Sequence, residues 1–594
     1  MNNQNPIVWI FTFEYEGVIK VGGLGEVPAN QVKSLSNKFN FTIFMPSNGQ
    51  IDNLKKKWLY DKLSIKCTGE INPSKLGLKD NNVKNYEIGF YQFYSDHGKI
   101  ILISGENDFS KKYLGDPSPY NPETFKGKVA LYSFGINCYI SHLFSDKSAI
   151  LPDLVHLHDY HVVIPFISMK QVLFKNNIHI PSLITIHLLT WPRYELSFLR
   201  ACGIDDTQIT LRLPSGLKSM KIREIFDLCT GDDKIQVPLL EKVGATICDM
   251  VITVSESYLN SDIIPYLGND LIKFKANFVW NGCDWVYDDI YSDVIDKMGE
   301  EIKNVLDLDS DVIISRDDLK KYLLTYKLGH LSSPPVINST KIINHIKELA
   351  QGDVISNDRS VKPFKTSGPL AIATGRISPQ KGIDIILEGI PRITQEVPDA
   401  KFLLLLLPTE YSLEQITNYF SYIRDYKKNL RIIFGKAFEL FYLSHLSADI
   451  YCAISRWEPF GITALEAMAA KIPLIATKVG GLQETMIDIR ENPEKGTGLL
   501  IEKENVDDFS NGVISLFKLA KLDNQINQSS QIRSKLMQEI PDPKIRDLNQ
   551  KYINYYEKIR ENCYNRVEKY FRWKEVSKKL ERLYNQIINL YNQK

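Results

Sequence analysis

The sequence lacks the features that usually identify zinc-binding, redox-active and membrane proteins. Its eight cysteines include no pair separated by two residues, so neither a zinc ribbon nor a dithiol redox motif is indicated. The most apolar stretch, FLLLLLP at 402–408, is far shorter than the about 20 residues that span a bilayer. The opening residues, MNNQNP, carry no basic segment of the kind that begins a secretory signal. We therefore expect a soluble, cytoplasmic protein with reduced thiols and no membrane partner.

The sequence also lacks an excess of charge of either sign. Its 72 lysines and arginines are balanced by 71 acidic residues, so no global field favours binding of nucleic acid. No internal repeat or low-complexity tract is present. The apolar content of 44% and charged content of 24% are those of an ordinary globular protein. A chain of 594 residues is too long for one core and predicts several domains.

Short apolar runs alternate with helix-like segments in two series, at residues 1–285 and 366–560. This alternation predicts an α/β protein with two Rossmann-like, doubly wound domains, each a parallel sheet with helices on both faces. Residues 286–365 are rich in Asp, Lys and Ser and predict an interdomain connection, whereas residues 561–594 predict a C-terminal helix that could cross back to the first domain. Because open α/β sheets bind ligands outside the carboxyl ends of their strands, we expect the site in a deep cleft between the two domains.

Two cations follow the first strand of the second series. In LAIATGRISPQKG the apolar run ends at Gly375, Arg376 comes next, and Lys381 stands where a helix should begin. Two positive side chains beside a helix N-terminus favour a bound polyanion, because their charge and the unpaired N–H groups act in the same direction. The alternative is an ordinary pair of surface cations on a loop.

Two carboxylates follow a later strand of the same series. Glu458 lies in the Pro- and Gly-containing loop of SRWEPFG, and Glu466 lies eight residues on, in a segment otherwise made of Ala, Leu and Met. A carboxylate on such a helix is costly to bury without partners, and sugar hydroxyls are suitable partners because each carboxylate accepts two or more hydrogen bonds. The alternative for Glu466 is a solvent-exposed helix face. A further run of glycines follows, in KVGGLQET at 478–485.

In the first series, polar residues again follow apolar runs. Three glycines in KVGGLG at 20–25 indicate either close approach of a ligand to the backbone or a tight turn. The run LVHLHDYH places His156, His158, Asp159 and His161 at the end of a strand, and SLITIH ends at His187. The histidines lack the helical spacing of a zinc site, and we expect strand alternation to send them to different faces. We therefore expect no metal there.

The order and content of these blocks resemble the bacterial and archaeal glycogen/starch synthase family, retaining glycosyltransferases with the GT-B fold. The motif K-[TV]-G-G-L-[GA]-[DE]-V appears as KVGGLGEV, H-x-H-D-[WY]-H as HLHDYH and T-x-H as TIH. In the second series R-[IL]-x-x-Q-K-G appears as RISPQKG, S-R-x-E-P-[CF]-G as SRWEPFG and G-G-L-x-[DE]-T as GGLQET. One departure is Leu188, which replaces the Asn that commonly follows the T-x-H histidine.

The resemblance implies a role for each matching position. Arg376 and Lys381 would neutralise the two phosphates of a nucleotide sugar, and Asp159 and His187 would face the anomeric centre. The carboxylate of Glu458 would hold the glucose 3- and 4-hydroxyls. The complete catalytic set is His187, Asp159, Arg376, Lys381 and Glu458. The donor-binding set is Lys20, Gly22 and Gly23 for the diphosphate and distal sugar, Glu458 with the N–H groups of Phe460 and Gly461 for the glucose, Glu466 for the ribose, and Gly480, Gly481 and Leu482.

The resemblance implies a synthase that transfers glucose from ADP-glucose or UDP-glucose to the non-reducing end of an α-1,4-glucan with retention of configuration. No metal or cofactor is implied. Two alternatives stay open: a related retaining GT-B enzyme whose acceptor is a lipid, a small sugar or a protein, and a glucan-binding scaffold without catalysis. The choice between adenine and uracil also stays open, because contacts to the base are mostly backbone and stacking contacts.

Overall fold

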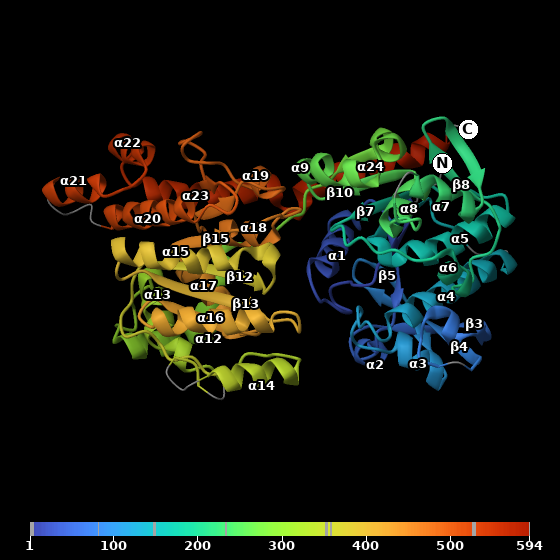
Figure 1. The fold of residues 1–594 in the computed structure, drawn as a ribbon, viewed down its shortest axis with the longest axis horizontal. Helices are drawn as coiled ribbons and strands as arrows, with labels where there is room; N and C mark the ends of the chain where they lie inside the picture. The colour runs from blue at the N-terminus through green and yellow to red at the C-terminus, as the bar shows by residue number, and fades with distance from the viewer. Residues whose placement is uncertain are drawn as a thin grey trace. The chain divides into compact units, whose positions relative to one another are not determined.

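The computed structural model describes residues 5–80, 82–146, 150–231, 234–350, 354–356, 359–524 and 530–592. The chain divides into two compact units (Figure 1). Unit 1 comprises residues 1–281 and 573–594, and unit 2 comprises residues 282–572. The segment 286–365, set apart above as a connection, lies within unit 2.

Unit 1 is built on a twisted sheet with the strand order β11-β10-β7-β6-β1-β2-β5-β4-β3. The strands from β11 to β5 run parallel, as predicted. Strands β4 and β3 extend the edge in antiparallel pairing, which corrects the expectation of a purely parallel sheet. The strands are β1 (Ile7–Phe11), β2 (Asn40–Pro46), β3 (Tyr60–Ile71), β4 (Lys84–Ser95), β5 (Gly98–Gly105), β6 (Leu154–His158), β7 (Ser182–Ile186), β10 (Met250–Thr253) and β11 (Ala276–Phe278), with a separate hairpin of β8 (Ile209–Leu213) and β9 (Gly216–Met220).

Helices cover both faces of this sheet, because successive side chains of a strand point to opposite sides. On β1, Trp9 and Phe11 pack with Tyr139, Tyr132 and Phe166, on helices α4 and α5. The principal helices of unit 1 are α1 (Gly23–Leu35), α2 (Ile51–Leu54), α3 (Asp108–Leu114), α4 (Phe125–Ser145), α5 (Val163–Lys175), α6 (Leu196–Ala201), α7 (Ile222–Thr230), α8 (Leu240–Ile247), α9 (Glu256–Tyr258), α10 (Ile264–Leu267), α11 (Asn269–Ile272) and α24 (Trp573–Asn592).

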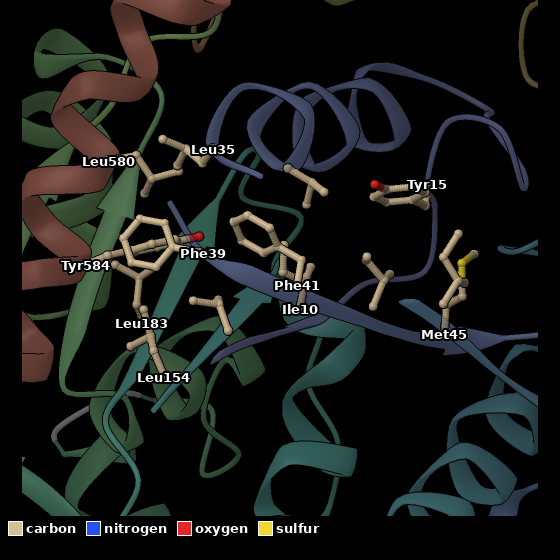
Figure 2. Close-up of a cluster of buried hydrophobic side chains, with 14 of the residues drawn as sticks. Ile10, Tyr15, Leu35, Phe39, Phe41, Met45, Leu154, Leu183, Leu580 and Tyr584 are labelled. Atoms are coloured by element: carbon tan, nitrogen blue, oxygen red, sulfur yellow. The ribbon is translucent and has the colours of Figure 1, made fainter. Parts of the chain in front are cut away.

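The other face of the sheet is covered by α1 and by α24, the helix near the end of the chain. Apolar residues of α24 recur every three or four positions and so form one stripe along the helix. Figure 2 shows Leu580 and Tyr584 of this stripe beside Leu35 and Phe39, in the same buried cluster as Ile10 of β1. The core of unit 1 is therefore assembled from both ends of the chain. The buried stripe consists of Leu580, Leu583, Tyr584, Ile587 and Ile588.

Unit 2 contains a parallel sheet with the strand order β14-β13-β12-β15-β16-β17. Strand β13, which lies between β14 and β12, is buried from Lys401 to Leu406, which is why its sequence is a nearly continuous apolar run. The strands are β12 (Leu370–Arg376), β13 (Lys401–Leu407), β14 (Leu430–Phe434), β15 (Ile450–Ala453), β16 (Leu474–Thr477) and β17 (Gly498–Ile501). The helices are α12 (Tyr287–Leu306), α13 (Arg316–Thr325), α14 (Thr340–Leu349), α15 (Ile383–Glu396), α16 (Leu413–Asp425), α17 (Phe438–Ser447), α18 (Ile462–Ala469), α19 (Leu482–Thr485), α20 (Val506–Asp523), α21 (Ser530–Gln538), α22 (Pro543–Lys551) and α23 (Tyr555–Arg566).

Each sheet has a point at which the strand order reverses, and such points are where open α/β sheets bind ligands. In unit 1 this point lies between β1 and β6, and in unit 2 between β12 and β15. Within the described residues, no helix is both long enough and apolar enough to traverse a bilayer.

Candidate active site

Asp159 lies where β6 ends, at the reversal point of the unit 1 sheet, and its backbone is strained. Its φ of 60° and ψ of 179° fall in a region that is favourable essentially only for glycine. The carboxylate is buried and accepts a hydrogen bond of 2.7 Å from the backbone N–H of His187, at the end of β7. Burial raises the pKa of Asp159 from its ordinary value of 3.8 to about 8. Strain of this kind persists only where the surroundings impose it, and it is typical of functional positions.

The histidines of β6 lie together rather than apart. The rings of His156 and His158 have centroids 4.2 Å apart, so the expectation that they would face opposite sides is wrong. The reason is that residues two apart in a strand share a face. His158 Nδ1 lies 2.9 Å from His187 Nε2, and burial lowers the pKa of His187 to about 3. His187 is therefore uncharged at neutral pH.

His156 links this cluster to the C-terminal helix. Its Nδ1 lies 2.6 Å from the hydroxyl of Tyr584 on α24, and its Nε2 lies 2.6 Å from Thr185 Oγ1 on β7. His156 therefore has both ring nitrogens occupied by side chains. Among the described residues no group of three or more His, Cys, Asp or Glu side chains is arranged to hold a metal ion.

The Lys20 loop is held by a buried glutamate that the sequence analysis did not single out. Glu14 Oε2 accepts hydrogen bonds from the backbone N–H groups of Val21 (2.5 Å) and Gly22 (3.0 Å). Its other oxygen accepts a hydrogen bond of 2.5 Å from the hydroxyl of Tyr120. Gly23 begins α1 and is exposed. The carboxylate of Glu14 thus fixes the backbone of this loop.

The ammonium of Lys20 is ion-paired within its own loop. Its Nζ lies 2.9 Å from Glu26 Oε2 and 3.1 Å from Glu16 Oε1. Burial lowers the pKa of Lys20, but the hydrogen bonds and charges of Glu26 and Glu16 outweigh it, so the net shift is upward. Lys20 is therefore fully charged, on the loop that follows β1.

In unit 2, Arg376 and Lys381 flank the loop after β12, as the sequence predicts. The Arg376 side chain is exposed, and neither a hydrogen bond nor an ion pair joins its guanidinium to the residues that the structure describes. Lys381 is mostly buried, and its Nζ lies 2.6 Å from Glu458 Oε2. The next residue must be glycine, because Gly382 has φ +59° and a Cβ there would lie 1.9 Å from the carbonyl oxygen of Ile454.

Glu458 occupies the loop after β15 and meets Lys381 across the reversal point. Ser455 Oγ donates a second hydrogen bond, of 3.1 Å, to Glu458 Oε2. The loop ends at Gly461, whose φ of +97° places it at the start of α18. The N–H groups of Phe460 and Gly461 donate no hydrogen bond to the described residues. Glu466 lies half-buried on α18.

The glycines of GGLQET support the Glu458 loop from the neighbouring strand, β16. A Cβ at Gly480, whose φ is +43°, would lie 2.0 Å from the carbonyl oxygen of Glu458. The N–H of Gly481 donates a hydrogen bond of 3.0 Å to that same oxygen. Leu482 is buried against Gly461. These three residues hold the loop that carries Glu458.

Arg456 is a second residue that sequence reasoning missed. Its guanidinium donates to both carboxylate oxygens of Asp384, at 3.0 and 2.5 Å, and to Glu504 at 2.9 Å. Its backbone N–H donates to the carbonyl of Gln380, next to Lys381. The hydrogen bonds to Asp384 and Glu504 raise the pKa of Arg456 above its ordinary range. Arg456 therefore ties the Glu458 loop to the Lys381 loop.

The structure thus gathers the predicted residues into one group in each unit. In unit 2 the group stands at the carboxyl ends of β12, β15 and β16, and in unit 1 at those of β1, β6 and β7. The unit 2 group presents two cations, a carboxylate and, at the start of α18, two backbone N–H groups that no described residue accepts from. Such a set can bind a phosphate-containing ligand with hydroxyl groups nearby.

Comparison with known proteins places the two units in related families. Residues 7–274 match the family model for the starch synthase catalytic domain, and residues 354–533 match the model for glycosyl transferases group 1. Glycogen synthase 2 of Geobacter sulfurreducens is 24% identical over 425 residues, which are 69% of this chain and 72% of the relative. The glycogen synthase of a Hydrogenobaculum species is 23% identical over 505 residues, or 84% of this chain and 87% of the relative.

A solved structure shows the same fold over the whole chain. The catalytic domain of starch synthase IV from Arabidopsis thaliana, bound to ADP and acarbose, matches with a TM-score of 0.62. The two sequences are 17% identical, and the match covers 99% of this chain and 100% of the other. The family matches and the shared GT-B fold lead to one assignment: the chain is a glycosyltransferase whose residues 7–274 belong to the starch synthase catalytic domain family and whose residues 354–533 belong to glycosyl transferases group 1.

Proposed function

We propose that this hexosyltransferase moves glucose from a nucleoside diphosphate glucose to the non-reducing end of an α-1,4-glucan, with retention of configuration. The observation that carries the proposal is the unit 2 cluster, in which Lys381 meets Glu458 at the reversal point of the sheet and Arg376 ends β12 at the same point. The donor's nucleoside diphosphate is assigned to this cluster and the acceptor to unit 1.

The cluster suits a diphosphate that has a sugar attached. Arg376 has no partner among the described residues, so its planar fork is available to phosphate oxygens. Lys381 supplies a second charge, and the N–H groups of Phe460 and Gly461 at the start of α18 add donors that no described residue uses. The carboxylate of Glu458, beside Lys381, would accept hydrogen bonds from sugar hydroxyls.

The reaction requires a good leaving group more than it requires a nucleophile. The bond between the glucose C1 and the phosphate oxygen breaks, and its electron pair leaves with the nucleoside diphosphate. The acceptor's 4-hydroxyl oxygen forms the new bond to C1, and its proton passes to the departing phosphate on the same face of the sugar. Arg376 and Lys381 stabilise the negative charge that develops, which is usually the largest contribution to catalysis.

The unit 1 cluster is assigned to the positive charge that develops on the sugar. The ring of His187 is uncharged at neutral pH, because burial lowers its pKa to about 3, so it can accept or donate a hydrogen bond without repelling a cationic sugar. Asp159 holds the backbone of His187 in place through the 2.7 Å bond to its N–H.

A direct test offers labelled ADP-glucose and UDP-glucose side by side, each with glycogen. We expect label in the glucan from at least one donor, released as glucose by an α-1,4-specific exoglucanase. Incorporation into an added lipid, small sugar or protein, with none into glycogen, would assign the enzyme to a different acceptor. Failure of both donors to label any acceptor would refute the proposal.

A further inference from the structure

Unit 1 contains an aromatic pocket to which the proposed reaction gives no role. Its cavity has a volume of about 250 Å³. That volume is below the about 300 Å³ at which pockets for drug-sized ligands begin, and it suits a single sugar ring better than a nucleotide. The pocket is lined by Tyr120, Pro122, Phe125, Lys126, Tyr160 and Tyr194.

The aromatic pocket lies next to the unit 1 cluster. Tyr160 directly follows the strained Asp159, and the ring of His161 stacks on Tyr160 with centroids 4.0 Å apart. His161 also lies 4.9 Å, between ring centroids, from Tyr120, the residue that Glu14 holds by a hydrogen bond. One wall of the pocket is therefore held by Glu14, which also holds the Lys20 loop, and Tyr160 in another wall is the neighbour of Asp159.

The lining matches the two kinds of surface on a pyranose. Aromatic faces pack against the C–H faces of a sugar ring, and tyrosine hydroxyls and an ammonium bond its hydroxyl groups. Lys126 is exposed at the pocket and has neither an ion pair nor a hydrogen bond within the described chain. The hydroxyl of Tyr194 has no hydrogen-bond partner there either, although its ring stacks on Phe198 with centroids 4.8 Å apart. Both polar groups are available to a ligand.

The charge around the pocket favours a neutral ligand over an anionic one. Lys126 is the one cation in the lining. The negative charge of Glu14 acts on Tyr120, and that of Glu241 acts on Tyr160. A phosphate in this position would be repelled by these carboxylates.

A pair of exposed aromatic rings continues from the pocket. The side chain of Thr190 lies close enough to the Tyr160 hydroxyl to act on its pKa, and the next residue, Trp191, is 49% exposed. Its ring centroid lies 6.0 Å from that of Tyr266, which is 54% exposed. Trp191 has a φ of 55°, rare for a bulky residue, and its backbone N–H donates a hydrogen bond of 3.1 Å to the carboxylate of the buried Glu241. The indole is thus held outward at a cost in backbone strain, which indicates a functional position.

We propose that the aromatic pocket binds a terminal glucosyl unit of the acceptor glucan and that Trp191 and Tyr266 stack on a unit further along the chain. This inference rests on the proposed function, since it names the surface that receives the acceptor. It assigns Tyr194 and Lys126 to acceptor binding and gives them no contact with the nucleotide sugar.

The test compares Tyr194→Ala, Tyr194→Phe and Lys126→Met with wild-type enzyme, using maltotetraose, maltoheptaose and glycogen as acceptors. We expect Tyr194→Ala to raise the KM for each acceptor about tenfold and Lys126→Met about threefold, with the KM for the nucleotide sugar changed less than about twofold. Tyr194→Phe keeps the stack on Phe198 and loses only the hydroxyl, so its effect should be smaller than that of Tyr194→Ala. Tyr60→Ala, at a 42% exposed tyrosine on β3, is the matched control and should change neither KM.

Trp191→Ala separates the two parts of the surface. We expect it to weaken the binding of maltoheptaose and glycogen more than that of maltotetraose, because only longer chains extend beyond the pocket. Equal acceptor KM values for Tyr194→Ala, Lys126→Met and the wild type would overturn the inference.

Calorimetric titration with maltoheptaose distinguishes failure of this inference from failure of the proposed function. Binding that Tyr194→Ala abolishes supports the aromatic pocket even if no donor supports glucan synthesis. Wild-type synthesis together with Tyr194-independent binding refutes the pocket and leaves the proposed function intact. Competition by glucose 6-phosphate that Lys126→Met removes would identify a sugar phosphate as the ligand and overturn the assignment to a neutral glucan.

Discussion

Replacement of Lys381 by methionine should affect stability and turnover through two different interactions. The ammonium of Lys381 lies 2.6 Å from Glu458 Oε2, and the two side chains are 20% and 12% exposed. Without it, Glu458 keeps the 3.1 Å hydrogen bond from Ser455 but loses its ion pair. Leaving a mostly buried charged group short of a partner costs about 1–3 kcal/mol. At about 2–4 °C per kcal/mol for domains of 150–250 residues, the Tm of Lys381→Met should fall by about 2–12 °C.

The effect on turnover is independent of that loss of stability. If Lys381 stabilises the departing diphosphate, its removal should lower kcat by about 10²–10³-fold, as the loss of one preorganised hydrogen-bond donor does in other enzymes. The double variant Lys381→Met/Glu458→Gln tests the separation, because it removes the unpaired charge as well. Its Tm should return toward the wild-type value, whereas its kcat should stay at least about 10² below wild type.

The control for this experiment is an ion pair of the same geometry elsewhere in unit 2. Lys471 Nζ lies 2.6 Å from Glu561 Oε1, and the Lys471 side chain is 22% exposed. Lys471→Met should lower the Tm but leave kcat unchanged. Differential scanning calorimetry and a glucan-incorporation assay on the four proteins measure both quantities. A Lys381→Met enzyme that keeps more than about a tenth of wild-type kcat, or a double variant that regains it, would refute the reasoning.

Three further predictions concern single residues and metal dependence. Arg376→Ala should lower kcat by about 10²–10³-fold. Its Tm should not change, because this exposed side chain has no partner among the described residues. A fall in Tm together with kcat would indicate a structural role instead. EDTA should leave glucan synthesis unchanged, since Arg376 and Lys381 neutralise the phosphates, and a requirement for added magnesium would contradict this. The Tm of Asp159→Asn should exceed that of the wild type by an amount that grows between pH 4 and pH 8. Burial raises the pKa of Asp159 in the native state from 3.8 to about 8, so the unfolded state loses this proton at a lower pH than the native state does. The stability of the wild type therefore falls as the pH rises through this range, whereas that of the variant does not. A Tm difference that is the same at both pH values would contradict that sign.

Most parallel strands of the two sheets were predictable from the sequence, and the antiparallel edge of the unit 1 sheet was not. Runs such as LVHLH and KFLLLLL became β6 and β13, because a parallel strand buried on both faces requires apolar residues throughout. Strands β3 and β4 have an alternating pattern and pair antiparallel, and the sequence analysis did not identify them. The expectation that His156 and His158 would lie on different faces was also wrong, since residues two apart in a strand share a face.

The positions of the candidate site residues at strand ends were likewise predictable, whereas their supports were not. Arg456 acts through Asp384, which is 72 residues away in the sequence, and Glu14 acts through backbone N–H groups and the hydroxyl of Tyr120. Neither partnership has a local sequence pattern, because both depend on which strands lie side by side. The roles of Gly480 and Gly481 in close packing likewise depend on the neighbouring loop.

The position of α24 has a consequence for how the protein is made. Its apolar stripe completes the core of unit 1, but roughly 290 residues of unit 2 are synthesised between residue 281 and this helix. At about 5–20 residues per second, the ribosome needs on the order of 15–60 s to reach it. Until then, residues 1–281 of unit 1 have an apolar sheet face that α24 does not yet cover, whereas unit 2 is complete and can fold. Chaperones that bind nascent chains should dwell longest on the part of this protein that is translated first.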